Sequence, residues 1–102
     1  MAAAETPESE DRRYTVGYSA KADRERADVA RSSPKDWKRI GARIGDLARS
    51  PRPYGSEKLT DVEGYKLRVG GWRVIYTVID KDRRVIVTRI SRRREDTYKG
   101  LP

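Results

Sequence analysis

Residues 65–79 have the sequence YKLRVGGWRVIYTVI, and this stretch decides the fold. Bases alternate with apolar residues in both halves, as in LRV at 67–69 and WRV at 72–74. Because neighbouring residues of a strand point to opposite faces of a sheet, one face can be buried while the other displays the bases. Gly70-Gly71 suits a two-residue hairpin turn. The stretch therefore predicts a β-hairpin with one cationic face.

A third strand is predicted after the hairpin. Asp80-Lys81-Asp82 indicates a turn, and residues 85–90 are rich in the β-branched residues that favour strands. The near-continuous apolar run at 72–79 is typical of a central strand. We expect a three-stranded antiparallel sheet whose bases meet a polyanion. These bases are Lys66, Arg68, Arg73, Lys81, Arg83, Arg84, Arg89, Arg92, Arg93 and Arg94.

A strand and two helices are predicted before the hairpin. Residues 13–18 alternate as a strand does, and a helix follows from residue 19 or 20 to about residue 31. A second helix is predicted from Pro34, with Ser33 as its N-cap, and Pro51 is expected to end it. Its apolar residues recur at three- and four-residue spacing and predict one buried stripe. They are Trp37, Ile40, Ile44, Leu47 and Ala48.

The fold class predicted is α+β, with the element order β-α-α-β-β-β and both helices packed on a small antiparallel sheet. A chain of 102 residues is short enough for one domain, which we assign to residues 13–102, including a basic C-terminal segment. Residues 1–12 hold several acids and almost no large apolar residue. They are therefore predicted to form a disordered acidic tail.

Composition excludes several kinds of site. The chain has no cysteine and no histidine, so it lacks disulfides, thiolate ligands and the usual general base. Its net charge of +8 favours an anionic partner, most often nucleic acid. No apolar stretch is long enough to span a bilayer, and the N-terminus lacks a signal-peptide pattern. We expect a cytoplasmic protein with no membrane partner, metal or cofactor.

Arginine and lysine can still catalyse the cleavage of RNA, because the nucleophile is the 2′-hydroxyl of the substrate itself. The protein then positions the backbone and stabilises the negative charge that builds on the phosphate oxygens. A tyrosine can orient a phosphate or a base, or transfer a proton, although its ordinary pKa of about 10 requires nearby cations. The candidates are Lys66, Arg68, Arg73, Arg93 or Arg94, and Tyr98.

From residue 14 to residue 101 the chain resembles the RelE/ParE toxin superfamily. The resemblance rests on a lysine-leucine pair, a tyrosine-led basic strand, a glycine turn, an aromatic-arginine strand and a basic run followed by a tyrosine. These are Lys58-Leu59, residues 65–69, Gly70-Gly71, residues 72–78, residues 90–94 and Tyr98. For the RelE-type branch, the resemblance implies a toxin that cleaves messenger RNA in the ribosomal decoding site without a metal. The products implied are a 2′,3′-cyclic phosphate and a 5′-hydroxyl.

The resemblance also implies the roles of individual residues. Lys66 and Arg68 match the two lysines of the basic strand, and Arg73 matches the arginine at the scissile phosphate. Arg93 is the best match for the arginine after the last strand, and Tyr98 matches the C-terminal tyrosine. Lys58, Arg92 and Arg94 are expected to contact RNA, and Arg92 and Arg94 also compete for the role of Arg93.

One position departs from the RelE pattern. The second lysine of the basic strand is a candidate general base in RelE-type toxins, and Arg68 takes its place here. Arginine stays protonated in proteins and cannot accept a proton. The sequence therefore leaves Lys66, which we favour, or Tyr98 as proton acceptor, or a reaction that depends on positioning and charge alone.

The partners implied by the resemblance are a cognate antitoxin protein, the ribosome with its messenger RNA, and operator DNA only through the antitoxin complex. A ParE-like toxin that poisons DNA gyrase is the alternative within the superfamily. A non-catalytic basic module that binds nucleic acid is an alternative of another class. The presence of both Arg73 and Tyr98 favours the endoribonuclease.

Overall fold

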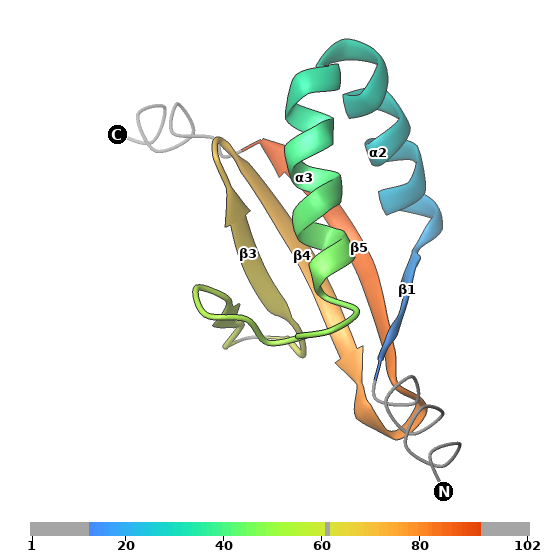
Figure 1. Ribbon diagram of the computed structural model, residues 1–102, viewed down its shortest axis with the longest axis vertical. Helices are drawn as coiled ribbons and strands as arrows, with labels where there is room; N and C mark the ends of the chain where they lie inside the picture. Colours follow the sequence, from blue (N-terminus) through green and yellow to red (C-terminus); the bar gives the residue numbers. More distant parts are fainter. Residues whose placement is uncertain (1–12, 61, 93–102) are drawn as a thin grey trace, which may run out of the picture.

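The computed structural model describes residues 13–60 and 62–92 (Figure 1). The elements are β1 (Thr15–Tyr18), α2 (Ala20–Ser32), α3 (Pro34–Asp46), β2 (Glu57–Lys58), β3 (Tyr65–Val69), β4 (Trp72–Ile79), the 3-10 turn η1 (Asp80–Asp82) and β5 (Arg84–Arg92). Within the described residues, neither helix has the length and apolar character needed to cross a membrane. The predicted acidic tail at residues 1–12 lies outside the described part of the chain.

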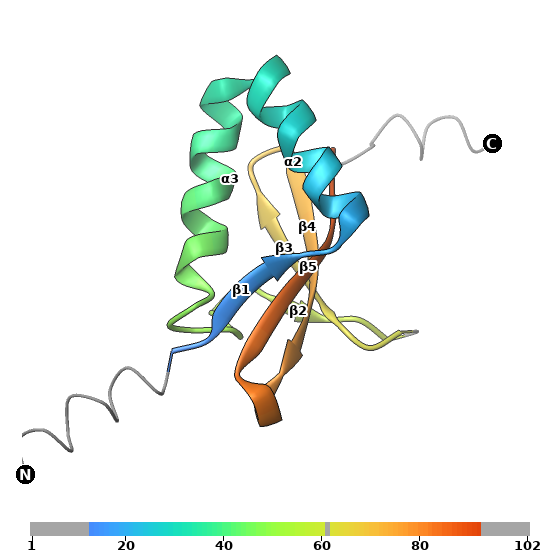
Figure 2. The same ribbon diagram turned by 90° about the vertical axis from the view of Figure 1, so that its right-hand side faces the viewer.

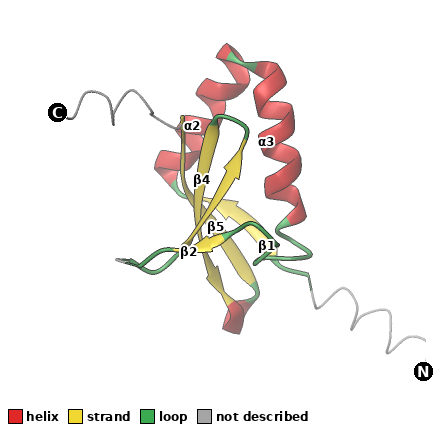
Figure 3. Ribbon diagram, turned by 90° about the vertical axis from the view of Figure 1, so that its left-hand side faces the viewer, coloured by secondary structure: helices red, strands yellow, loops and turns green. Residues whose placement is uncertain are grey.

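The five strands form one sheet in the order β1-β5-β4-β3-β2 (Figure 3). The pairs β2–β3, β3–β4 and β4–β5 are antiparallel. β1 pairs with β5 in parallel, from Thr15 opposite Arg84 to Tyr18 opposite Val87. The predicted α+β class and order of elements are confirmed. The structure adds the parallel pairing of β1 and the two-residue strand β2.

One face of the sheet packs against the helix layer, and no element of residues 13–60 and 62–92 covers the other, which we call the open face (Figure 2). The buried strand residues all occupy positions that face the helix layer: Leu67, Val69, Val74, Tyr76, Val85, Val87 and Ile90. Ala22 and Val29 of α2, together with Ile40, Ile44 and Leu47, complete the core. The alternate strand positions hold only half-buried or exposed side chains. Burying each large aliphatic side chain stabilises the fold by about 1.5–3 kcal/mol.

A bulge in β5 keeps its apolar residues on the buried face. Ile75 pairs with Arg89 and Tyr76 pairs with Val87, so Thr88 is the extra residue. The Thr88 hydroxyl donates a hydrogen bond to the Ile75 carbonyl at 3.2 Å. Because a shift of one residue reverses the faces of a strand, the bulge places both Val87 and Ile90 in the core.

α2 begins at the end of β1 and protects the edge of β5. The helix begins at residue 20, within the predicted bounds, and the Ser19 hydroxyl caps it by accepting a hydrogen bond from the Ala22 amide at 3.1 Å. β1 is too short to cover the whole of β5, and Glu25 of α2 reaches the remainder of the strand. Its carboxylate accepts the Ile90 amide at 2.7 Å and pairs with Arg89 at 3.2 Å. The part of the β5 edge that β1 does not reach is thereby covered by a helix instead of another strand.

α3 starts as predicted and ends earlier than predicted. It begins at Pro34 with Ser33 at the N-cap position, although the Ser33 hydroxyl makes no capping hydrogen bond. With a single residue between the helices, the Ser33 amide instead donates to the Val29 carbonyl at 2.7 Å and ends α2. The expectation that Pro51 ends the helix is also wrong, because α3 ends at Asp46 and a turn follows.

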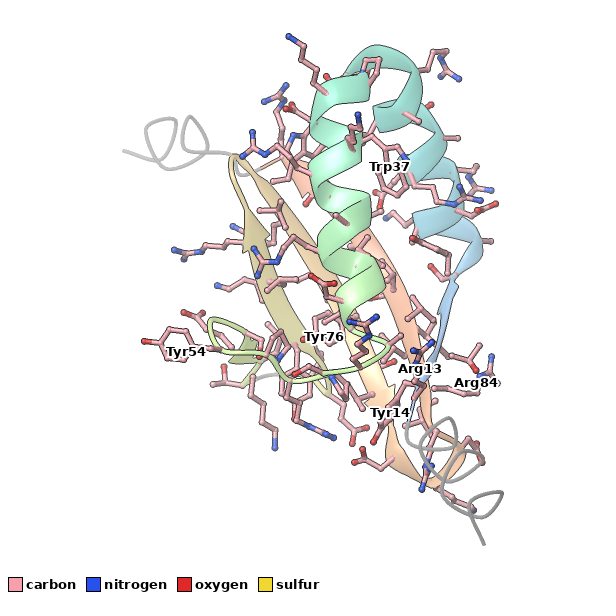
Figure 4. The ribbon with its side chains drawn as sticks, viewed as in Figure 1. Arg13, Tyr14, Trp37, Tyr54, Tyr76 and Arg84 are labelled. Carbon is pink, nitrogen blue, oxygen red and sulfur yellow. The ribbon has the colours of Figure 1, made fainter. Side chains whose placement is uncertain are left out.

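Two aromatic residues of β4 connect the sheet to the helix layer. The Trp72 indole N–H donates to Asp36 of α3 at 3.0 Å. The hydroxyl of the buried Tyr76 donates to the Pro51 carbonyl at 2.8 Å, beside the loop that leaves α3 (Figure 4). Burial raises the pKa of Tyr76. Both polar atoms are thus paired, as buried donors must be.

Asp80 joins three segments at the end of the sheet. Its carboxylate accepts hydrogen bonds from the Tyr14 hydroxyl at 2.5 Å and from the Arg52 guanidinium at 2.7 Å. Arg52 also donates to the Tyr65 hydroxyl at 2.8 Å. The hydrogen bond from Arg52, and then that from Tyr14, holds the pKa of Asp80 below its ordinary value of 3.8. The charged form of Asp80 is therefore the one that the fold stabilises.

We predict that Asp80→Asn lowers the melting temperature at neutral pH. A carboxylate whose pKa is lower in the folded state contributes stability above its unfolded-state pKa, and this contribution is lost as the pH falls through the folded-state pKa. The difference between wild type and variant should be full above about pH 5 and disappear in more acidic solution. Asp82→Asn, on the same turn, is the control for charge. Equal losses in the two variants, or an undiminished difference at about pH 2, would contradict the assignment.

Candidate nucleic-acid interface

The open face of the sheet brings together three of the predicted catalytic residues. Arg68 of β3 lies directly opposite Arg73 of β4, and Lys66 is two positions away along β3. Residues directly opposite each other have Cβ atoms about 4.5–5.5 Å apart and point to the same face. Residues two apart in a strand also share a face. We name Lys66, Arg68 and Arg73 the basic face.

Arg73 lies at the centre of the basic face. It is half-buried between Arg68 on one side and Ser91 on the other. Its Nε is buried and has no hydrogen-bond partner among the residues that the structure describes. A buried donor without an acceptor costs roughly 1–3 kcal/mol, and adjacent cations repel each other. An anion bound at Arg68 and Arg73 would relieve that repulsion.

Glu57 is a fourth member of this site that the sequence analysis missed. β2 pairs with β3 so that Glu57 lies opposite Lys66, and their side chains form an ion pair at 3.3 Å. The Lys66 side chain is 22% exposed, whereas that of Glu57 is 61% exposed. The carboxylate is therefore accessible at the rim of the basic face. A two-residue strand is too short to show alternation, so no sequence pattern identified Glu57.

Two residues predicted to bind RNA lie on the other side of the sheet. Arg92 is opposite Trp72, and its guanidinium stacks 4.8 Å from the centre of the Trp72 ring. Lys58 is opposite Tyr65. Trp72 and Tyr65 alternate with the basic face along their strands, so Arg92 and Lys58 point toward the helix layer. The remaining predicted site residues, Arg93, Arg94 and Tyr98, lie outside the described residues.

A cavity of about 510 Å³ lies at the open end of the hairpin, far from the Gly70-Gly71 turn. Its lining includes two bases and two acids: Arg52, Lys58, Glu63 and Asp80. Arg52 already forms an ion pair with Asp80, and its guanidinium carbon lies 5.4 Å from the centre of the Tyr65 ring. Within residues 13–60 and 62–92, no group of three or more potential ligands could hold a metal ion. The lining of the cavity is thus of mixed charge, whereas the three residues of the basic face are all cations.

The chain is similar in sequence and fold to proteins of toxin-antitoxin systems. A family model described as the ParE toxin of type II toxin-antitoxin system, parDE, matches residues 16–97. The fold is similar to the RelBE2 toxin-antitoxin complex from Mycobacterium tuberculosis, at 25% identity and a TM-score of 0.67, over 79% of this chain and 92% of that chain. It is also similar to the intact RelBE complex from E. coli, at 26% identity and a TM-score of 0.64, over 78% and 95% of the two chains.

A third solved structure shows the same fold at lower identity. It is the YoeB/ParE toxin from Agrobacterium tumefaciens, at 17% identity and a TM-score of 0.69, over 76% of this chain and 96% of that chain. No curated protein sequence matches the chain.

The family model begins in β1 and extends beyond β5, so it includes both helices, the whole sheet and the basic face. The resemblance to the RelE/ParE superfamily, first inferred from short motifs, is thereby confirmed over most of the chain. The chain belongs to the family of ParE toxins of type II toxin-antitoxin systems, within the RelE/ParE superfamily.

Proposed function

We propose that this toxin cleaves messenger RNA, with the RNA 2′-hydroxyl as nucleophile and the basic face as the catalytic surface. The observation that carries the proposal is the grouping of Lys66, Arg68 and Arg73 on the open face of the sheet, with the Glu57 carboxylate at its rim. The similarity to two RelBE complexes supports the RelE-type activity that the sequence motifs imply.

Arg68 and Arg73 are proposed to stabilise the transition state. As the 2′-oxygen bonds to phosphorus and the bond to the 5′-oxygen breaks, negative charge increases on the non-bridging phosphate oxygens. Two guanidinium groups side by side can donate hydrogen bonds to these oxygens and offset the charge. Arg73 is half-buried and therefore held in place, whereas Arg68 is exposed and can adjust to the substrate.

Glu57 replaces Lys66 as our proposed proton acceptor. The Lys66 ammonium already pairs with the carboxylate, which suits it to hold Glu57 or a phosphate in position. The carboxylate can accept the proton of the 2′-hydroxyl, and the 5′-oxygen that leaves takes a proton from water. The products are a 2′,3′-cyclic phosphate and a 5′-hydroxyl. The roles of Arg93 and Tyr98 remain predictions.

We propose that the substrate is held in the decoding site of cytoplasmic ribosomes. The basic face consists of only three side chains, so a larger structure must hold the flexible message in line for attack. The partner that neutralises the toxin is proposed to be a cognate antitoxin whose acidic or amphipathic segment complements the basic surface. Operator DNA is then bound only through the antitoxin complex.

Gyrase poisoning is the second candidate, because the matching family model is that of ParE toxins. Primer extension on a message under translation, with and without chelator, tests the first candidate, and a gyrase supercoiling assay tests the second. We expect cuts in translated message that persist in chelator, poor cleavage of free RNA and unchanged gyrase activity. Inhibition of gyrase without any cut in the message would overturn our proposal.

We predict that Arg73→Ala slows cleavage by about 10² or more, the usual cost of removing one donor to transition-state charge. Growth inhibition should fall with it, while the circular dichroism melt shows a folded protein. Arg84→Ala is the matched control, because Arg84 is exposed on the same face at the far end of β5 and should cut as the wild type does. A folded Arg73→Ala protein with the wild-type rate would refute the role of Arg73.

We predict that Glu57→Gln lowers the single-turnover rate by about 10², the lower range for loss of a general base. Glu63→Gln is the control, because Glu63 lines the cavity at the open end of the hairpin. Lys66→Arg keeps the positive charge and should keep most activity. Loss of activity in Lys66→Arg, with none in Glu57→Gln, would make Lys66 the acceptor.

A further inference from the structure

α3 carries a row of bases on the helix layer, away from the basic face. Lys35, Arg39 and Arg43 are four residues apart, so they follow one another along one side of the helix at about 6 Å per step. Lys38 lies beside them. Arg43 is half-buried and the other three are exposed. We name these four residues the α3 row.

The α3 row makes no ion pair with the acids near it. Within residues 13–60 and 62–92, none of its four members forms an ion pair. On α2, by contrast, Arg26 and Arg31 each pair with an aspartate three residues earlier, at 2.7 and 2.6 Å. Asp36, the acid within the α3 row, is engaged by the indole N–H of Trp72. The four cations of the α3 row therefore have no ion-pair partner within the described chain, although Asp36 and Asp46 lie on the same helix.

Arg39 packs against the turn of the hairpin. A Cβ atom added to Gly70 would lie 2.6 Å from Arg39 Nη2, closer than real Cβ contacts allow. The guanidinium thus lies directly over the glycine backbone. Since the turn belongs to the same hairpin as the basic face, Arg39 places the α3 row at the same end of the molecule as Arg68 and Arg73, on the other side of the sheet.

We propose that the α3 row docks the phosphate backbone of double-helical RNA. Complementary charge selects a polyanion, and lysine and arginine that neutralise phosphates release counterions. Proteins that bind single strands usually stack the bases on exposed aromatic rings. Two aromatic residues lie beside the row, and both are engaged within the fold. Trp37 is half-buried with its ring against Gly41 (Figure 4), and Trp72 is half-buried with its indole N–H donated to Asp36. A straight row of bases without a stacking ring fits duplex RNA, which is recognised mainly through its backbone and shape.

This inference goes beyond the proposed cleavage, because it assigns a second RNA-binding surface that contributes no catalytic group. The basic face would hold a single strand, while the α3 row holds a folded RNA beside it. Binding of a duplex can be measured without cleavage. Failure of one proposal therefore leaves the other to be judged on its own data.

The test compares the full-length wild type, the variant R39Q/R43Q and the control K21Q/R24Q, which removes the same charge from exposed positions of α2 that form no ion pair. The probes are an RNA stem-loop of about 16 base pairs and a 2′-O-methylated single strand of equal length that cannot be cut. Fluorescence anisotropy is measured across salt concentrations, and thermal melts verify folding. We expect R39Q/R43Q to weaken stem-loop binding about 10-fold or more and to reduce the salt slope by about 2.

The control and the single strand decide the outcome. The assignment is supported if K21Q/R24Q binds the stem-loop as the wild type does, and if R39Q/R43Q binds the single strand as the wild type does. Equal weakening in both variants would overturn it, since net charge alone would then account for binding. Weakening of the single strand as much as the stem-loop would also overturn it. If R39Q/R43Q instead loses binding to polyglutamate and keeps the stem-loop, the α3 row belongs to an acidic protein partner.

Discussion

The two-residue turn at Gly70-Gly71 fixes which face of the sheet each residue of the hairpin occupies. Gly70 has a φ of 60°, which glycine adopts at little cost in the first position of such a turn, and Val69 pairs with Trp72 across it. A shift of the strand register by one residue would expose the apolar side chains and point Arg68 and Arg73 toward the core. Burial of the core and display of the basic face are therefore set by the same register.

Local alternation predicted the centre of the sheet well and its edges poorly. β3 and β4 have the predicted bounds because both signals are visible in adjacent residues. These signals are the alternation of side chains along each strand and the two glycines of the turn. The parallel pairing of β1 depends on β5 near the other end of the chain, and no local pattern encodes it. The bulge at Thr88 is likewise a property of the β4–β5 pair. The bulge helps to place Arg92 on the helix side of the sheet. The run of three arginines at residues 92–94 shows no alternation, so the sequence does not indicate which face Arg92 occupies.

The candidate site shows the same division. Lys66, Arg68 and Arg73 were predicted together, because they alternate with core residues on neighbouring strands. Glu57 was missed because only tertiary pairing brings it to Lys66. Its position matters chemically, since Arg68 cannot accept a proton and the chain has no histidine. In the cleavage that we propose, a carboxylate held by a lysine at the rim of a cationic surface would be the acceptor that the basic residues lack.

The central claim is that the basic face assists attack by the substrate's own 2′-hydroxyl. The most direct test is a message with a single 2′-deoxy nucleotide at the mapped cleavage position, presented to the toxin on ribosomes beside the unmodified message. Our account predicts that cleavage at the modified position disappears while the unmodified message is cut there. Equal cleavage of the two messages at that position would contradict the account, because the nucleophile would then come from elsewhere.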